Sequence, residues 1–267
     1  MDIRLLFIGD IVGENGLAFL IDTFPKLKEK YNPNFIVTNG ENIWQGKGLN
    51  EEDAKLLFKS DVDVITTGNH IWENWKSRPL LASNDRVLRP MNYPSGNPGK
   101  GSVIVEKHNI KIAVAQLQGR TFLQTIDCPF RAADAFLHNL DGKADVIIID
   151  FHAETTAEKM AMGWHLDGRV AAMLGTHTHV QTADAQILPN GTAFISDVGM
   201  TGPYDSVLGM RKDIALKRYI LQTAHKFELA ESDMKVAGAY LEIDSNTGQA
   251  NYIEPFVYPQ FNTKSGI

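Results

Sequence analysis

The chain has 267 residues, of which 43% are hydrophobic and 22% charged, and its formal net charge is −6. These values are ordinary for a globular protein, and the length suits one large α/β domain or two small ones. No long block of lysine or arginine occurs, so an extended nucleic-acid-binding face is not expected, although a small phosphate-bearing ligand is compatible with the charge.

The lone cysteine, Cys128, excludes an intramolecular disulfide and argues against a thiolate metal cage. The sequence Met1-Asp2-Ile3-Arg4 leads straight into a short apolar strand without a signal-peptide pattern. No apolar stretch approaches the roughly 20 residues that span a bilayer. We therefore expect a cytoplasmic protein without a membrane partner.

Strand and helix patterns alternate in the first part of the chain. The periodicity predicts strands over 3–8, 35–38 and 62–66, and helices over 17–30 and 51–60. Asn50 is placed to cap the second helix. This β-α-β-α-β order favours parallel strands joined by right-handed crossovers.

The pattern changes after a loop rich in glycine and proline at 94–99. Thr155 and Glu158 form a capping-box signature for a helix that runs to about residue 167. The other expected elements are strands over 102–105, 110–116, 144–150, 170–174, 186–188, 192–196, 236–243 and 250–257, and helices over 131–140 and 213–224. We expect an α/β fold with two sheets packed face to face, helices outside, and a single domain covering residues 1–267.

Five strand-like runs each end in residues that can bind metals. The segments are Gly9-Asp10, Asn39-Gly40-Glu41-Asn42, Gly68-Asn69-His70, Asp150-Phe151-His152 and Gly175-Thr176-His177-Thr178-His179. Loops at the carboxyl ends of strands in an open α/β sheet meet in one crevice, so these residues can converge. Carboxylate and amide oxygens beside imidazoles suit a borderline divalent metal such as Zn, Mn or Fe.

Two neighbouring ions need a bridging carboxylate, terminal ligands and a shared hydroxide. Asp10 suits a terminal carboxylate, and Glu41 suits the bridge because one carboxylate can bind both ions. Neutral ligands are available from Asn69, His152, His177 and His179. An extended backbone at 177–179 would point both imidazoles to the same side, whereas a turn would splay them between two metals.

The charge of such a centre favours phosphate chemistry. Two divalent cations, two carboxylates and one hydroxide leave a net charge of about +1, which attracts an anionic phosphoryl group. His70 follows a presumed ligand directly, so it lies near the centre without having to bind a metal. That position suits a general acid that protonates the leaving oxygen.

Some of these residues can also be explained by a structural role without any function in metal or substrate binding. Gly-Asp, Asn-Gly and Gly-Asn pairs are common in turns, and a single buried histidine is often only hydrogen-bonded. Glu154 either supports an imidazole or belongs to the start of the following helix, and we favour the helix. The glycine-rich segments 44–48 and 197–204 are either flexible connections or parts of a substrate-contacting rim.

The five segments resemble the motifs of calcineurin-like metallophosphoesterases, which run Asp-x-His, Gly-Asp, Gly-Asn-His, His and Gly-His-x-His. Val12 stands where the first motif has its histidine, Glu41 replaces the bridging aspartate, and Thr176 separates Gly175 from the next histidine. These departures are similar to one bacterial branch, the YmdB-like phosphodiesterases, in which Asn42 fills the gap left by the missing histidine. The likeness extends from residue 1 to about residue 257 and includes 162–169 and 197–203.

The resemblance implies a four-layer α-β-β-α sandwich and two metal ions, iron or manganese. It also implies a small phosphodiester substrate, a 2′,3′-cyclic nucleotide that is opened to a nucleoside 3′-phosphate, with His70 as the catalytic residue. A homo-oligomer is left open. The implied ligands are Asp10, Glu41, Asn42 and His179 for one metal, and Glu41, Asn69, His152 and His177 for the other.

Two other functions fit parts of the pattern. A metal-dependent amidohydrolase on a (β/α)8 barrel also uses a His-x-His pair, but that pair normally ends the first strand, and the strand-rich C-terminal third disfavours such a barrel. A regulatory protein could bind a nucleotide or a metal with little turnover. Retention of His70 and of both carboxylates favours an enzyme, since binding alone needs no general acid.

Overall fold

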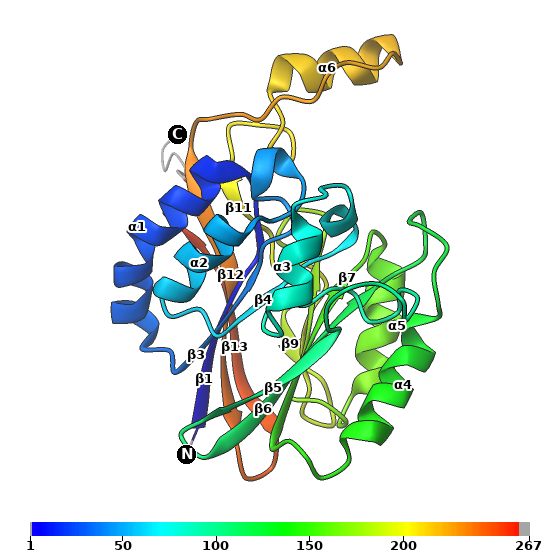
Figure 1. Cartoon of the computed structure of the whole chain (residues 1–267). Helices are drawn as coiled ribbons and strands as arrows, with labels where there is room; N and C mark the ends of the chain where they lie inside the picture. Colours follow the sequence, from blue (N-terminus) through cyan, green and yellow to red (C-terminus); the bar gives the residue numbers. More distant parts are fainter. Residues whose placement is uncertain (1, 262–267) are drawn as a thin grey trace.

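The computed structural model describes residues 2–261, whose strands form two sheets packed face to face (Figure 1). The first sheet contains β1 (Asp2–Ile8), β2 (Asp10–Ile11), β3 (Phe35–Asn39), β4 (Val64–Thr66), β11 (Met200–Pro203), β12 (Met234–Asp244) and β13 (Gln249–Tyr258). Its order is β2-β11-β12-β1-β3-β4, and β13 also pairs with β12.

The second sheet has the order β5-β6-β7-β8-β10-β9. Its strands are β5 (Ser102–Lys107), β6 (Ile110–Gln118), β7 (Val146–His152), β8 (Ala172–Thr176), β9 (Gln186–Ile187) and β10 (Ala193–Ile195). The helices are α1 (Gly13–Tyr31), α2 (Glu51–Lys59), α3 (Ser77–Ser83), α4 (Pro129–Leu140), α5 (Thr156–Leu166) and α6 (Lys212–Leu221), with short 3-10 turns η1 (Trp44–Gly46) and η2 (Asn69–Trp72).

Strand β1 shows why the sandwich forms. Leu5 and Phe7 point into a core shared by both sheets, whereas Leu6 and Ile8 point into a core between the first sheet and the helices α1 and α2. The strand is therefore apolar on both faces, as expected for a strand in the interior of a layered fold. A third core lies between the second sheet and α4 and α5. The layers are helix, sheet, sheet and helix (Figure 1).

The structure confirms the main elements predicted from the sequence. β1, β3 and β4 pair in parallel, and β5 and β6 form an antiparallel hairpin. The Asn50 side chain caps α2 by accepting a hydrogen bond from the Asp53 backbone N–H at 2.9 Å. None of the helices among the described residues is long and apolar enough to cross a membrane.

Three local expectations were wrong or incomplete. Met200–Pro203, expected as part of a glycine-rich loop, is β11 and pairs with β2 and β12. Helix α3 was missed. Thr155 does cap α5, but the Glu158 carboxylate does not return the bond; it accepts from the backbone N–H groups of Arg120 and Thr121.

Strands β8 and β10 approach closely at Gly175. A Cβ at this position would overlap the Ser196 carbonyl oxygen, a backbone atom that cannot move without disturbing the sheet. We predict that Gly175→Ala lowers the free energy of unfolding by about 1–3 kcal/mol or more, measured by urea denaturation. Gly96→Ala is the control, because a Cβ there meets nothing within 4 Å. Equal midpoints for the two variants would contradict this.

Candidate metal centre

The seven residues expected to bind metals, together with His70, gather at one end of both sheets. Each follows or ends a strand, so the loops bring together positions that are far apart in the sequence. Asp10 lies in β2, Glu41 and Asn42 follow β3, Asn69 and His70 begin η2 after β4, His152 ends β7, and His177 and His179 follow β8. All eight lie in one cluster or line the cavity beside it.

His152 occupies the centre of this cluster and is completely buried. Its Nε2 lies 2.9 Å from Glu41 Oε1, 2.9 Å from His177 Nδ1 and 3.2 Å from Asn69 Oδ1. A single ring N–H cannot satisfy three such neighbours. One ligand atom each from Glu41, His152 and His177 lies within 4.8 Å of the others, a grouping that can hold one cation.

Two oxygens in the cluster lack partners. Asp10 Oδ1 and Asn42 Oδ1 are buried, and neither accepts a hydrogen bond within the described part of the chain, whereas the buried Glu41 Oε1 has Nε2 of His152 at 2.9 Å. The Asn42 amide nitrogen donates to the Gly46 carbonyl, which leaves its oxygen free. Uncompensated buried carboxylate oxygens are costly, so this donor set fits divalent cations. A Cβ at Gly68 would overlap the His152 ring, so a side chain there would obstruct the cluster.

Burial and charge act together on the titration of the cluster. Burial raises the pKa of Asp10 well above its usual value. Burial also opposes ionisation of Glu41, but attraction to His152 outweighs it and lowers the pKa of Glu41. The same attraction overcomes burial and raises the pKa of His152. A proton on His152 thus offsets the Glu41 charge, and a bound cation would replace that proton.

The segment 177–179 is a turn and not an extended strand. His177 and His179 have φ angles of 105° and 66°, which are uncommon for residues with side chains. The turn splays the two imidazoles: His177 faces His152, whereas His179 Nε2 lies 3.9 Å from Asp10 Oδ2. This arrangement agrees with the second of the two geometries considered from the sequence.

A buried ion pair holds this turn in place. Lys159 Nζ lies 2.8 Å from Asp197 Oδ2, and both side chains are almost completely buried. The same Asp197 oxygen accepts from the backbone N–H and the hydroxyl of Thr178, at 2.9 and 2.8 Å. Thr178 separates the two turn histidines, so the pair fixes the segment that carries them. Sequence reasoning missed both residues.

A polar network also orients His152 through its Nδ1, the ring nitrogen that faces away from the cluster. Its Nδ1 lies 2.9 Å from Thr176 Oγ1, and the Thr176 hydroxyl donates to Asp150 at 2.7 Å. Because that hydroxyl already donates to Asp150, Nδ1–H of His152 is the donor to Thr176, and Nε2 faces the cluster. Asn39 and Thr66 complete the bonds to Asp150. Thr176, which separates Gly175 from His177, therefore links His152 to Asp150 and fixes the orientation of the imidazole.

His70 and His177 each contact a carboxylate outside the proposed ligand set. His70 Nδ1 lies 2.6 Å from Glu73, which also pairs with Lys47. Glu154 lies 3.0 Å from His177 Nε2, so the favoured reading of Glu154 as only part of a helix start was wrong. The position of Glu73, three residues after His70, could have indicated from the sequence that the two side chains contact each other, but this contact was not predicted.

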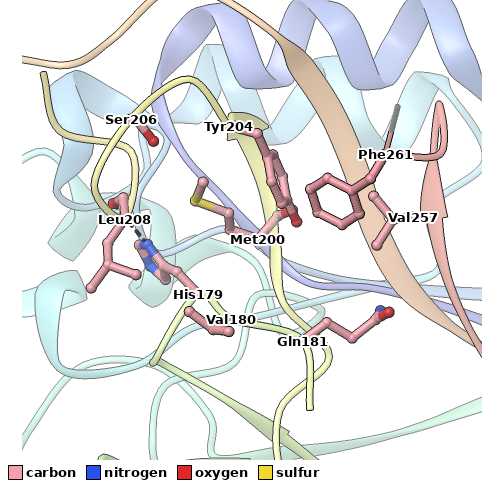
Figure 2. A pocket seen from close by; sticks show the side chains of 9 residues that line it. All are labelled: His179, Val180, Gln181, Met200, Tyr204, Ser206, Leu208, Val257 and Phe261. Carbon is pink, nitrogen blue, oxygen red and sulfur yellow. Dashed lines mark hydrogen bonds between the residues drawn. The ribbon is translucent and has the colours of Figure 1, made fainter. Parts of the chain in front are cut away.

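Two cavities adjoin the cluster. The larger one, of about 420 Å³, is lined by Glu41, Asn42, His70, His177 and His179, and by Gly46 and Lys47 of the first glycine-rich segment. We refer to it as the catalytic cavity. The other, of about 370 Å³, lies beyond His179 and is lined mainly by apolar and aromatic side chains (Figure 2). The second glycine-rich segment contributes Met200 and Tyr204 to this other cavity.

The α-β-β-α sandwich, with the buried cluster at its strand ends, has the architecture of the metallophosphoesterase fold. The NAD nucleotidase of Haemophilus influenzae shares this fold: the superposition has a TM-score of 0.58 at 13% identity, covering 96% of this chain and 56% of that chain. At that identity the likeness concerns the fold alone.

More similar proteins identify the family. The sequence matches the family model for YmdB-like proteins over residues 6–256. The 2′,3′-cyclic-nucleotide 2′-phosphodiesterase of Bacillus subtilis is 47% identical over 251 residues, which cover 94% of this chain and 95% of that protein. A crystal structure described as a novel phosphatase from Mycoplasma pneumoniae superposes with a TM-score of 0.91 at 32% identity, covering 96% of this chain and 93% of that one. The chain belongs to the YmdB-like family, as the sequence motifs indicated.

The ion pair beneath the 177–179 turn gives a testable consequence. Lys159→Met would leave Asp197 buried without its cation, which we expect to lower the free energy of unfolding by about 3–5 kcal/mol and to reduce the bound metal. Urea denaturation and elemental analysis measure the two effects. Lys55→Met is the control, because the pair of Lys55 with Glu51 is exposed and should leave both quantities unchanged. Native stability in Lys159→Met would refute the anchoring role.

Proposed function

We propose that the protein hydrolyses 2′,3′-cyclic nucleotides to nucleoside 3′-phosphates with two divalent metal ions, iron or manganese. The observation that carries this proposal is the buried group of oxygens and imidazoles around His152, at the wall of an open cavity. Two of its oxygens, Asp10 Oδ1 and Asn42 Oδ1, accept no hydrogen bond within the described residues. The substrate class is taken from the Bacillus subtilis relative, with which this chain aligns over nearly its whole length.

The proposed ligands divide between two sites. Asp10, Glu41, Asn42 and His179 would hold one ion, and Glu41, Asn69, His152 and His177 the other. The short separations around His152 support the second set, and the free Asp10 and Asn42 oxygens support the first. Bound metals supply Lewis-acid polarisation of the phosphoryl oxygens and lower the pKa of water.

His70 is the proposed proton donor to the leaving ribose oxygen. It lines the catalytic cavity, and its backbone N–H donates to Glu41 Oε2 at 3.0 Å, which fixes its distance from the cluster. Its Nδ1 faces Glu73, so Nε2 is the ring nitrogen left for the substrate. The Glu73 carboxylate at Nδ1 holds the ring in place, so a proton on Nε2 can pass to the leaving oxygen.

The proposal is tested on purified protein loaded with manganese. We expect two metals per chain by elemental analysis, and faster hydrolysis of 2′,3′-cyclic nucleotides than of phosphate monoesters in competition assays. Preference for monoesters would contradict the substrate, and nucleotide binding without turnover would favour the regulatory alternative.

Glu41→Gln tests the bridging role. The amide keeps the shape of the side chain but removes the charge that two cations share, so we expect most of the activity to be lost and the metal content to fall. Glu14→Gln is a suitable control, because Glu14 is exposed and lies outside the proposed ligand set. Unchanged turnover in Glu41→Gln, or one metal in a fully active chain, would contradict the dinuclear assignment.

His70→Ala tests the proton donor. A ribose hydroxyl is a poor leaving group that needs a proton, whereas a nitrophenolate leaves readily without one. We expect retained metals, a loss of about 10²–10⁴-fold in kcat on a cyclic nucleotide, and a distinctly smaller loss on a nitrophenyl phosphodiester. Equal losses on both substrates would indicate charge stabilisation instead, and loss of a metal would make His70 a ligand.

A further inference from the structure

The catalytic cavity has an apolar wall that the proposed chemistry does not use. It comes from residues 205–231, which leave β11 and return to β12; we call this segment the cap. Its helix, α6, projects away from both sheets (Figure 1). The cap lines the cavity with Leu208, Met210, Arg218, Phe227 and Leu229.

The base of the cap is anchored against the metal centre. The Leu208 carbonyl lies 3.1 Å from His179 Nδ1, and Arg211 N–H donates to the Glu228 carbonyl at 3.0 Å. Leu229 approaches the backbone at Gly13 and Gly46 so closely that a Cβ at either position would meet its side chain. The two segments that form the wall are therefore held beside the cluster, the first through Leu208 and the second through Leu229.

The lining of this wall suits a flat, largely apolar ring. Phe227 is the only phenylalanine, tyrosine or tryptophan among the described residues that line the catalytic cavity, and 43% of its surface is exposed. Arg218 adds a cation, and its guanidinium has no hydrogen-bond or ion-pair partner within residues 2–261. The cavity volume of about 420 Å³ falls in the range of small-molecule pockets.

We propose that the cap wall binds the nucleobase of the substrate, with Phe227 stacking on the base and Arg218 donating hydrogen bonds beside it. The inference rests on the proposed function, because a cyclic nucleotide with its phosphate at the metal centre must place its base elsewhere in the same cavity. Stacking on one aromatic face accepts every base, so the wall contributes affinity with little base preference.

The neighbouring cavity is a weaker candidate. It carries the aromatic side chains of Tyr204 and Phe261, but of the proposed metal ligands only His179 lines it (Figure 2). Phe261 is exposed like Phe227, so it provides a matched control for the removal of an aromatic ring.

The test compares two cyclic diesters: adenosine 2′,3′-cyclic phosphate, and methyl riboside 2′,3′-cyclic phosphate, which has no base. Phe227→Ala should lower kcat/KM for the nucleotide by about 5- to 150-fold, through KM, and leave the base-free diester unchanged. Phe227→Tyr should keep native values, because tyrosine also stacks. Phe261→Ala should leave both substrates unchanged.

Four results would overturn the assignment: equal kcat/KM of the native protein for the two diesters, an equal loss on both in Phe227→Ala, an unchanged nucleotide KM in that variant, or a nucleotide-specific loss in Phe261→Ala. Each of these results leaves the proposed function intact if the native protein hydrolyses the cyclic phosphate of either diester. If it hydrolyses neither, the proposed function fails, and titration of the manganese-loaded protein with adenosine 3′-monophosphate and with ribose 3-phosphate still decides the inference. Phe227→Ala must then weaken binding of the nucleotide alone.

Discussion

The burial of Asp10 and Glu41 beside His152 is the constraint on which the rest of the site depends. Both carboxylates are inaccessible to solvent; Asp10 Oδ1 accepts no hydrogen bond in the described chain, and Glu41 Oε1 faces Nε2 of His152. Such groups are tolerated only when a cation compensates them. Attraction between Glu41 and His152 and the hydrogen bond from the His177 backbone N–H to Asp10 provide part of that compensation, and the proposed metals would complete it. The polar network beneath His152 keeps this ring directed at the remaining charge.

The centre depends on the packing of the two sheets, because each sheet supplies only part of it. The first sheet presents its carboxylates, amides and His70, and the second presents the three imidazoles. The core between the sheets, where Phe7 and Leu174 pack, therefore sets the distance from Glu41 to His152. A change that separates the sheets would dismantle the metal centre without touching a ligand.

Much of this arrangement could be predicted because the ligands lie at strand ends, and buried strands have a strong sequence signal. The positions of Asp10, Glu41, His152 and the histidine turn followed from that signal. Lys159 and Asp197 could not be predicted in the same way. A lysine within a helix is normally on the surface, and nothing local indicates that it meets an aspartate 38 residues away. Strand β11 was missed because its glycine and proline are typical of a turn, and its pairing with β2 is a tertiary contact.

The cap separates two demands that the site must meet. Metal binding needs rigid donors, which the strand ends and their polar networks provide. Substrate binding needs a surface that can accept different organic groups, and an excursion between β11 and β12 can supply one without altering the ligands. The bond from His179 to the Leu208 carbonyl joins the two parts. Because that bond fixes the second ring nitrogen of a proposed ligand, the position of the cap bears directly on the metal centre. Changes in the cap sequence can therefore alter substrate affinity freely only at residues beyond this contact.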